Sequence, residues 1–126
     1  MKVLCVDDSA LIREIVARAA EVLDLDTVEA RDGREALDQV ARHRDEIRLI
    51  TLDWHMPGMN GFDFLQAVKQ HAEYKAIPVL MLTSESAKEN IVKAIKAGVD
   101  NYLLKPFAQE DLLVKMKECM GLGDGA

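Results

Sequence analysis

Polar residues stand directly after four short apolar runs of the sequence, and their types are those that bind ions and react. The runs are Lys2–Val6, Leu49–Leu52, Pro78–Leu82 and Asn101–Leu104, and the polar residues after them are Asp7 and Asp8, Asp53, Thr83 and Ser84, and Lys105. Carboxylates can bind a cation or act as nucleophiles, whereas hydroxyl and ammonium groups can bind an anion. If the four segments meet in space, they form one polar site.

A structural role explains each of these residues when it is taken alone. Asp8 can cap a helix, as short polar residues at helix starts often do. Asp53 can belong to a structural salt bridge, because a buried acid is costly unless it is paired. Thr83 can connect a strand to a loop, and Lys105 can be an ordinary solvated lysine. For the residues to have only structural roles, all four of these independent explanations must be true at once. A single shared site explains the whole set more simply.

The elements that must position these residues alternate regularly along the chain. A fifth and weaker apolar run, Thr27–Ala30, joins the four above, and segments with apolar spacing near 3.6 residues lie between the runs. This pattern predicts five strand–helix units. The runs at 49–52 and 78–82 are continuously apolar, which is typical of a parallel sheet that is covered on both faces. The predicted fold class is therefore α/β, with ligands bound beyond the carboxyl ends of the strands.

Capping residues support the helix boundaries. Asp32 and Ser86 each stand three residues before a glutamate, the spacing of a reciprocal cap at a helix start. Gly98 and Gly121 stand where left-handed residues would end the fourth and fifth helices. We expect one domain over residues 1–120 and a flexible tail over residues 121–126.

Composition excludes several classes of function. The chain has 126 residues and a formal net charge of −6, and its sequence pI is near 5.0. An acidic domain of this size is a poor candidate for direct nucleic-acid or membrane binding. Two cysteines that are far apart in sequence fit reduced thiols, and no targeting or membrane-spanning segment is evident. We therefore expect a cytoplasmic location.

The polar stretches also match a known pattern. They read Val6-Asp7-Asp8-Ser9, then Leu52-Asp53-Trp54-His55-Met56-Pro57-Gly58-Met59-Asn60-Gly61, then Leu82-Thr83-Ser84-Glu85, and Lys105-Pro106-Phe107. As a set they resemble the response-regulator receiver family, and among its members the stand-alone chemotaxis proteins. The resemblance spans residues 2–119. It implies a doubly wound five-stranded parallel sheet of strand order 2-1-3-4-5, and a phosphoacceptor signalling protein rather than an enzyme.

The resemblance implies a role for each polar residue. Asp53 corresponds to the phosphoacceptor, and Mg²⁺ is the implied cofactor. Lys105, the hydroxyl of Thr83 and the amide of Ser84 would contact the phosphoryl oxygens. The implied metal ligands are Asp8, Asp53 and the backbone carbonyl of His55, with Asp7 assisting directly or through water.

The resemblance also implies a switch and partners. Thr83 would move toward the phosphoryl group while Tyr102 turns inward, and Pro106 is a candidate for a cis peptide bond. The fourth helix, fifth strand and fifth helix would form the surface for a target protein, with Lys88, Lys93, Lys96 and Lys115 on it. The implied partners are a histidine kinase as phosphodonor, a target such as the flagellar motor switch, and a phosphatase.

Other readings of the sequence remain open. A magnesium-dependent phosphatase of the haloacid dehalogenase type also uses an aspartate at a strand end, but it needs a second aspartate at the position of His55. A flavodoxin-like cofactor carrier would need a hydroxyl-rich loop where Asp7 and Asp8 stand. A receiver-like interaction module that is never phosphorylated is the third. His55 replaces the asparagine common in chemotaxis members, so the lifetime of the phosphoryl group does not carry over from them.

Overall fold

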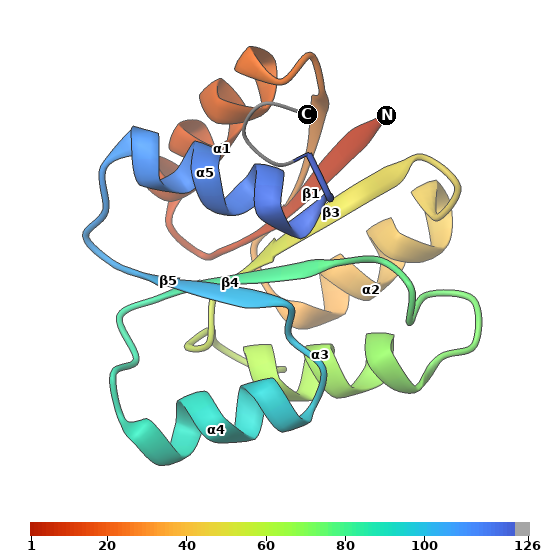
Figure 1. Ribbon diagram of the computed structural model, residues 1–126. Coiled ribbons are helices and arrows are strands. Elements are labelled where there is room, and N and C mark those ends of the chain that lie inside the picture. The colour runs from red at the N-terminus through yellow and green to blue at the C-terminus, as the bar shows by residue number, and fades with distance from the viewer. Residues whose placement is uncertain (123–126) are drawn as a thin grey trace.

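The computed structural model describes residues 1–122 and contains five strands and five helices in strict alternation (Figure 1). Residues 123–126, which make up most of the predicted tail, lie outside the described residues. In chain order the elements are β1 (Lys2–Val6), α1 (Ala10–Val22), β2 (Asp26–Ala30), α2 (Gly33–His43), β3 (Ile47–Leu52), α3 (Gly61–Gln70), β4 (Val79–Thr83), α4 (Lys88–Lys96), β5 (Asn101–Leu104) and α5 (Gln109–Cys119).

The five strands form one parallel sheet of order β2-β1-β3-β4-β5. This confirms the predicted fold class and strand order. The order reverses direction at β1 and β3, and a crevice for ligands forms outside such a reversal at the carboxyl edge. The last residues of β1 and β3 lie side by side, because Val6 pairs with Leu52, and Leu52 pairs with Met81, two residues before the end of β4. The residues that follow β1, β3 and β4 therefore meet at one edge.

Side chains on the two faces of the sheet form two separate apolar clusters. Leu4 and Val6 of β1 point into one cluster, which α2, α3 and α4 cover. Val3 and Cys5 of the same strand point into the other, which α1 and α5 cover. Figure 1 shows these two helix layers on opposite sides of the sheet. Burial on both faces explains why the central strands carry continuous apolar sequence.

Three of the four predicted caps are confirmed. The Asp32 carboxylate accepts a hydrogen bond from the backbone N–H of Glu35 at 2.8 Å, and Gly98 and Gly121 have φ values of 108° and 74°. The expected cap at Ser86 is wrong. The N-cap of α4 is Ala87, which has no side-chain hydrogen bond to offer, and the carboxylate of Glu85 takes that role instead.

No helix among residues 1–122 combines the length and the apolar character that crossing a membrane requires. Cys5 is buried and Cys119 is partly buried, and both are free thiols. Burial raises the pKa of the Cys5 thiol to about 12 and that of Cys119 to about 11, so both thiols stay protonated at neutral pH.

Candidate functional site

Three carboxylates from two strands meet at the carboxyl edge of the sheet. Asp7 and Asp8 follow β1 and Asp53 follows β3, and one oxygen of each lies within 4.8 Å of the others. Asp7 is 1% exposed and Asp53 is 6% exposed, whereas Asp8 faces solvent. The backbone positions them, because the N–H of Asp7 donates to the oxygen of Ala30 and the N–H of Asp53 to the oxygen of Val6.

Lys105 carries the opposite charge into this cluster from β5. Its Nζ lies 2.8 Å from Oδ2 of Asp7 and 3.5 Å from Oδ2 of Asp53. The backbone N–H of Lys105 donates to the oxygen of Thr83, which anchors the start of the loop. The next peptide bond, Lys105–Pro106, is cis, and Pro106 is the residue that the family resemblance made a candidate for such a bond.

Asp7 has an unusual electrostatic environment for an aspartate. Burial raises the pKa of its carboxyl group above the ordinary value. Two hydrogen bonds, from Lys105 and from the N–H of Ser9, oppose that rise, and so does the positive charge of Lys105. The negative charge of Asp53 raises the pKa further. The pocket therefore holds more negative charge than one ammonium group neutralises. It fits a divalent cation, because oxygens of three carboxylates can converge on one point and hard cations such as Mg²⁺ prefer carboxylate ligands.

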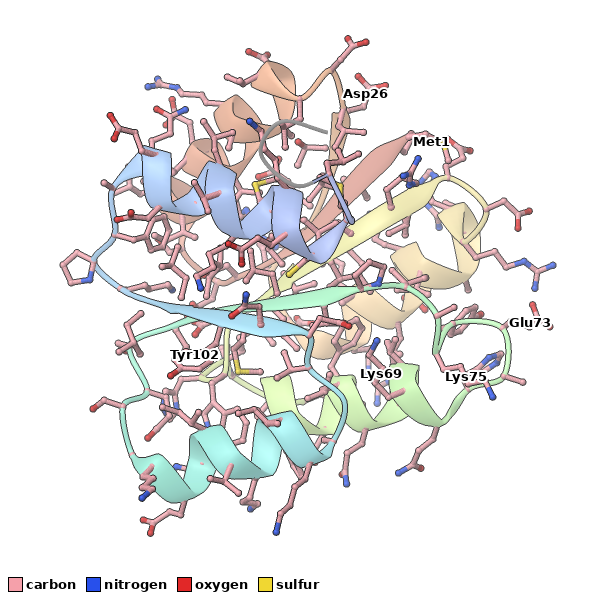
Figure 2. The ribbon with its side chains drawn as sticks, in the orientation of Figure 1. Met1, Asp26, Lys69, Glu73, Lys75 and Tyr102 are labelled. Atoms are coloured by element: carbon pink, nitrogen blue, oxygen red, sulfur yellow. The ribbon has the colours of Figure 1, made fainter. Side chains whose placement is uncertain are left out.

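The remaining predicted residues surround this cluster on the β4 and β5 side. Thr83 is 2% exposed, and its Oγ1 accepts a hydrogen bond from the N–H of Glu85 at 3.1 Å. Ser84 is exposed. Tyr102 lies on the side of the sheet that α4 occupies (Figure 2). The residue is 37% exposed, and it lines a small apolar cavity together with Thr83 and Ala94.

His55 forms a contact that the sequence alone did not predict. Its backbone N–H lies 3.4 Å from Oδ1 of Asp53. Its ring Nε2 lies 2.7 Å from Oε2 of Glu85, a residue 30 positions later in the chain. The ring thus bridges the loops that follow β3 and β4.

Two further positioning residues lack a sequence signal strong enough to have predicted them. Arg13 of α1 donates from Nη1 to the backbone oxygen of Asp7 at 2.8 Å and pairs with Glu29 at 3.0 Å. Gly61, the first residue of α3, packs against the backbone of Asp53 so closely that a Cβ there would overlap the Asp53 oxygen. A glycine at a helix start is a weak hint of such a close approach.

A doubly wound sheet with three carboxylates and a lysine at its carboxyl edge is typical of the receiver class of signalling domains. Residues 3–117 match the family of the response regulator receiver domain, and the chain belongs to that family.

Similar proteins agree on this class. The chain is 38% identical over 126 residues to a chemotaxis protein CheY homolog of Campylobacter jejuni, covering 99% of this chain and 96% of that protein. It is 40% identical over 125 residues to chemotaxis protein CheY1 of Helicobacter pylori, covering 98% of this chain and all of that protein.

Solved structures with the same fold include the chemotaxis response regulator CheY4 of Vibrio cholerae. It has a TM-score of 0.86 and 38% sequence identity to this chain, and the match covers 94% of this chain and 97% of that one. The receiver domain of DrrB, solved in a BeF3-activated form, has a TM-score of 0.83 at 26% identity, over 95% of this chain and 97% of that one. The chain is therefore a CheY-type receiver domain, a signalling module by family.

Proposed function

We propose that this chain is a phosphorylation-dependent switch in which Asp53 accepts a phosphoryl group from a histidine kinase. The main support is the position of the Asp53 carboxylate, which is nearly buried and lies 3.5 Å from the Lys105 ammonium group. A carboxylate is a weak nucleophile toward a phosphoryl group that carries negative charge. Positive charge close to both reactants lowers that barrier, and this pocket supplies it.

The transfer is an in-line displacement at phosphorus. An oxygen of Asp53 forms a bond to phosphorus while the bond from phosphorus to the donor imidazole nitrogen breaks, and that nitrogen keeps the electron pair. The Lys105 ammonium group binds a phosphoryl oxygen as the charge redistributes. The hydroxyl of Thr83 and the amide of Ser84 donate to the other oxygens.

Mg²⁺ is the proposed cofactor. Asp8, Asp53 and the backbone carbonyl of His55 would hold it, with Asp7 acting directly or through a water molecule. When it is bound, the ion neutralises negative charge on the phosphoryl oxygens. The convergence of the three carboxylates supports this proposal, since each carboxylate otherwise raises the energy of the others.

The output of the switch is a change on the α4–β5–α5 surface. A phosphoryl group adds a charge of about −1.5 to −2 at the edge of the sheet, which draws the hydroxyl of Thr83 toward it. Tyr102 then turns into the space beside Thr83, where the small cavity lies. A target protein reads the new surface. Because the similar proteins named above are chemotaxis proteins, the favoured target is a flagellar motor switch, with a phosphatase ending the signal in the cytoplasm.

A direct test is phosphorylation by a small donor. The protein is incubated with acetyl phosphate and Mg²⁺, and its intact mass is measured. We expect one added phosphoryl group in the wild type, none in Asp53→Asn, and one in the control variant Asp63→Asn, which changes an exposed aspartate on α3.

Two other results would contradict the proposal. An unchanged mass of the wild-type protein would favour an interaction module that is not phosphorylated. Sustained release of phosphate from many phosphate esters would favour the phosphatase reading. For the output, a pull-down that compares phosphorylated and unphosphorylated protein would identify the target, since only the former should retain it.

A further inference from the structure

The contact between His55 and Glu85 joins two loops at the mouth of the site. The His55 side chain is 60% exposed and that of Glu85 is 13% exposed, with Nε2 and Oε2 separated by 2.7 Å. An ionised carboxylate can only accept hydrogen bonds, so Nε2 of His55 carries the proton and donates it. A surface contact between two flexible side chains adds little unless other bonds hold at least one of them. Glu85 is held in this way.

The second carboxylate oxygen of Glu85 serves as the cap of α4. Oε1 accepts a hydrogen bond from the backbone N–H of Ala87 at 2.8 Å. Ala87 is the N-cap residue and provides no side-chain acceptor. The free N–H groups at the start of a helix need an acceptor, and Glu85 provides one from outside the helix. These two bonds lower the pKa of Glu85, the one from Ala87 more than the one from His55, so the carboxylate is ionised at neutral pH.

The other end of the contact reaches the phosphoacceptor candidate. The backbone N–H of His55 lies 3.4 Å from Oδ1 of Asp53. A continuous path of hydrogen bonds therefore runs from the Asp53 carboxylate through His55 and Glu85 to the first turn of α4. Glu85 also donates its own N–H to Oγ1 of Thr83 at 3.1 Å. It is therefore bound to both His55 and Thr83, the two residues beside Asp53 that a phosphoryl group would approach.

We propose that the His55–Glu85 contact is a latch that fixes the start of α4 in the unphosphorylated protein, and that phosphorylation of Asp53 opens it. This inference rests on the proposed function. A phosphoryl dianion beside Asp53 competes with Glu85 for the donor group of His55 and repels the Glu85 carboxylate. Once Glu85 moves, α4 loses its only side-chain cap in the described structure.

His55 and Glu85 are positioning residues in this account. They act on α4 from the side of β3 and β4, whereas the coupling between Thr83 and Tyr102 acts through β5. The latch therefore gives the phosphoryl group a second route to the α4–β5–α5 surface. It also assigns a role to the histidine that distinguishes this chain from the common chemotaxis pattern.

Amide hydrogen exchange over the first turn of α4, residues 87–91, tests the latch. The full chain is used with and without acetyl phosphate and Mg²⁺, and intact mass gives the phosphoryl occupancy at which samples are compared. In the unphosphorylated protein, we expect His55→Ala and Glu85→Ala each to speed exchange by about fivefold, the effect of losing one helix cap. The double variant should be no faster than Glu85→Ala. Phosphorylated wild type should match unphosphorylated His55→Ala, and phosphorylation should add little to the exchange of that variant.

Control variants separate the latch from general damage. His55→Gln keeps a donor on a side chain of similar reach and should recover most of the slow exchange. His71→Ala changes another exposed histidine at the end of α3 and should leave α4 unchanged. Unchanged exchange in unphosphorylated His55→Ala, or an equal response to phosphorylation with and without the histidine, would overturn the latch. An absence of added mass on the wild type would instead contradict the proposed phosphorylation, while the unphosphorylated samples still judge the capping contact.

Discussion

Lys105 is the one cationic side chain that contacts the carboxylate oxygens of the cluster within residues 1–122, so its removal should cost stability in a way that depends on metal. Its Nζ lies 2.8 Å from Asp7 and 3.5 Å from Asp53, and the three side chains are 19%, 2% and 8% exposed. Lys105→Met keeps an unbranched apolar stem and removes the charge. Two nearly buried carboxylates are then left without a counter-ion.

The expected magnitude follows from these distances. At an effective dielectric constant of about 20, the 2.8 Å pair contributes roughly 6 kcal/mol of attraction and the 3.5 Å pair roughly 5 kcal/mol. Removing the lysine also removes the cost of desolvating its ammonium group, which is several kcal/mol. Breaking a buried pair usually costs 3–5 kcal/mol. Because Lys105 keeps some contact with water, we expect the free energy of unfolding to fall by about 3 kcal/mol.

Urea denaturation at pH 7, in EDTA and again with excess Mg²⁺, measures this cost. In EDTA the full loss of stability should appear. With Mg²⁺ the loss should shrink to less than half, because the carboxylates left without Lys105 should bind Mg²⁺ more tightly than those of the wild type, and tighter binding to the folded state stabilises the variant more. The matched control is Lys69→Met. Lys69 lies in the last turn of α3 (Figure 2), its side chain is 13% exposed, and its Nζ contacts the oxygen of Ile77 at 2.7 Å and Asp100 at 3.4 Å rather than the acidic cluster. That variant should lose stability equally with and without Mg²⁺.

The pH dependence gives the same prediction a second check. The folded-state pKa of Asp7 is raised above 3.8, so the stability associated with its protonated form is present at low pH and is lost as pH rises through the folded pKa. Lys105 opposes that rise, and its loss moves the pKa higher. The deficit of Lys105→Met should therefore be larger at pH 7 than near pH 4. This reasoning would be refuted if Lys105→Met were as stable as wild type in EDTA. It would also be refuted if the loss in free energy of unfolding were the same with and without Mg²⁺ and at both pH values.

Three other substitutions test separate parts of the structure. Gly61→Ala should lower the free energy of unfolding by about 1–3 kcal/mol and weaken Mg²⁺ binding, because the new Cβ displaces the backbone of Asp53. Urea denaturation checks the first effect against wild type, and calorimetric titration with Mg²⁺ checks the second. Asp32→Ala removes the cap of α2 and should cost about 1 kcal/mol in urea denaturation, with no change in Mg²⁺ affinity. Trp54 is 9% exposed and adjoins the cluster, so Mg²⁺ should change its fluorescence in wild type and much less in Asp8→Ala; equal responses would argue against Asp8 as a ligand.

Much of the fold could be predicted because local and long-range signals agree. Continuous apolar runs predicted buried parallel strands, and the polar residues after them, such as Asp53 and Lys105, meet at one edge in the structure. The strand at Asp26–Ala30 had a weak signal because it is an edge strand with only its last residue fully buried. The polar residues that follow the strands lie close together because the sheet is parallel, and a parallel sheet has the carboxyl ends of all its strands at the same edge.

Contacts between loops could not be predicted in the same way. The cap of α4 illustrates this, since Ser86 has the right residue type and spacing but the helix starts too late for it, and Glu85 caps instead. Which side chain reaches a free N–H depends on the path of the loop after β4. The His55–Glu85 contact depends on two such loops at once, so no spacing rule in the sequence reveals it.

The sheet also separates the interior into two apolar compartments, so a substitution in one compartment should affect mainly the packing of that compartment. Phe64 belongs to the compartment under α2, α3 and α4, and Leu112 to the one under α1 and α5. Truncating both should change stability additively, because the two residues belong to different clusters on opposite faces of the sheet and share no packing partners among those clusters. Trp54 and Ala94 lie in the Phe64 compartment. A cavity there should disturb the packing of α4 and of Trp54 beside the carboxylates, whereas a cavity of equal size beside Leu112 should lower stability and leave that packing intact.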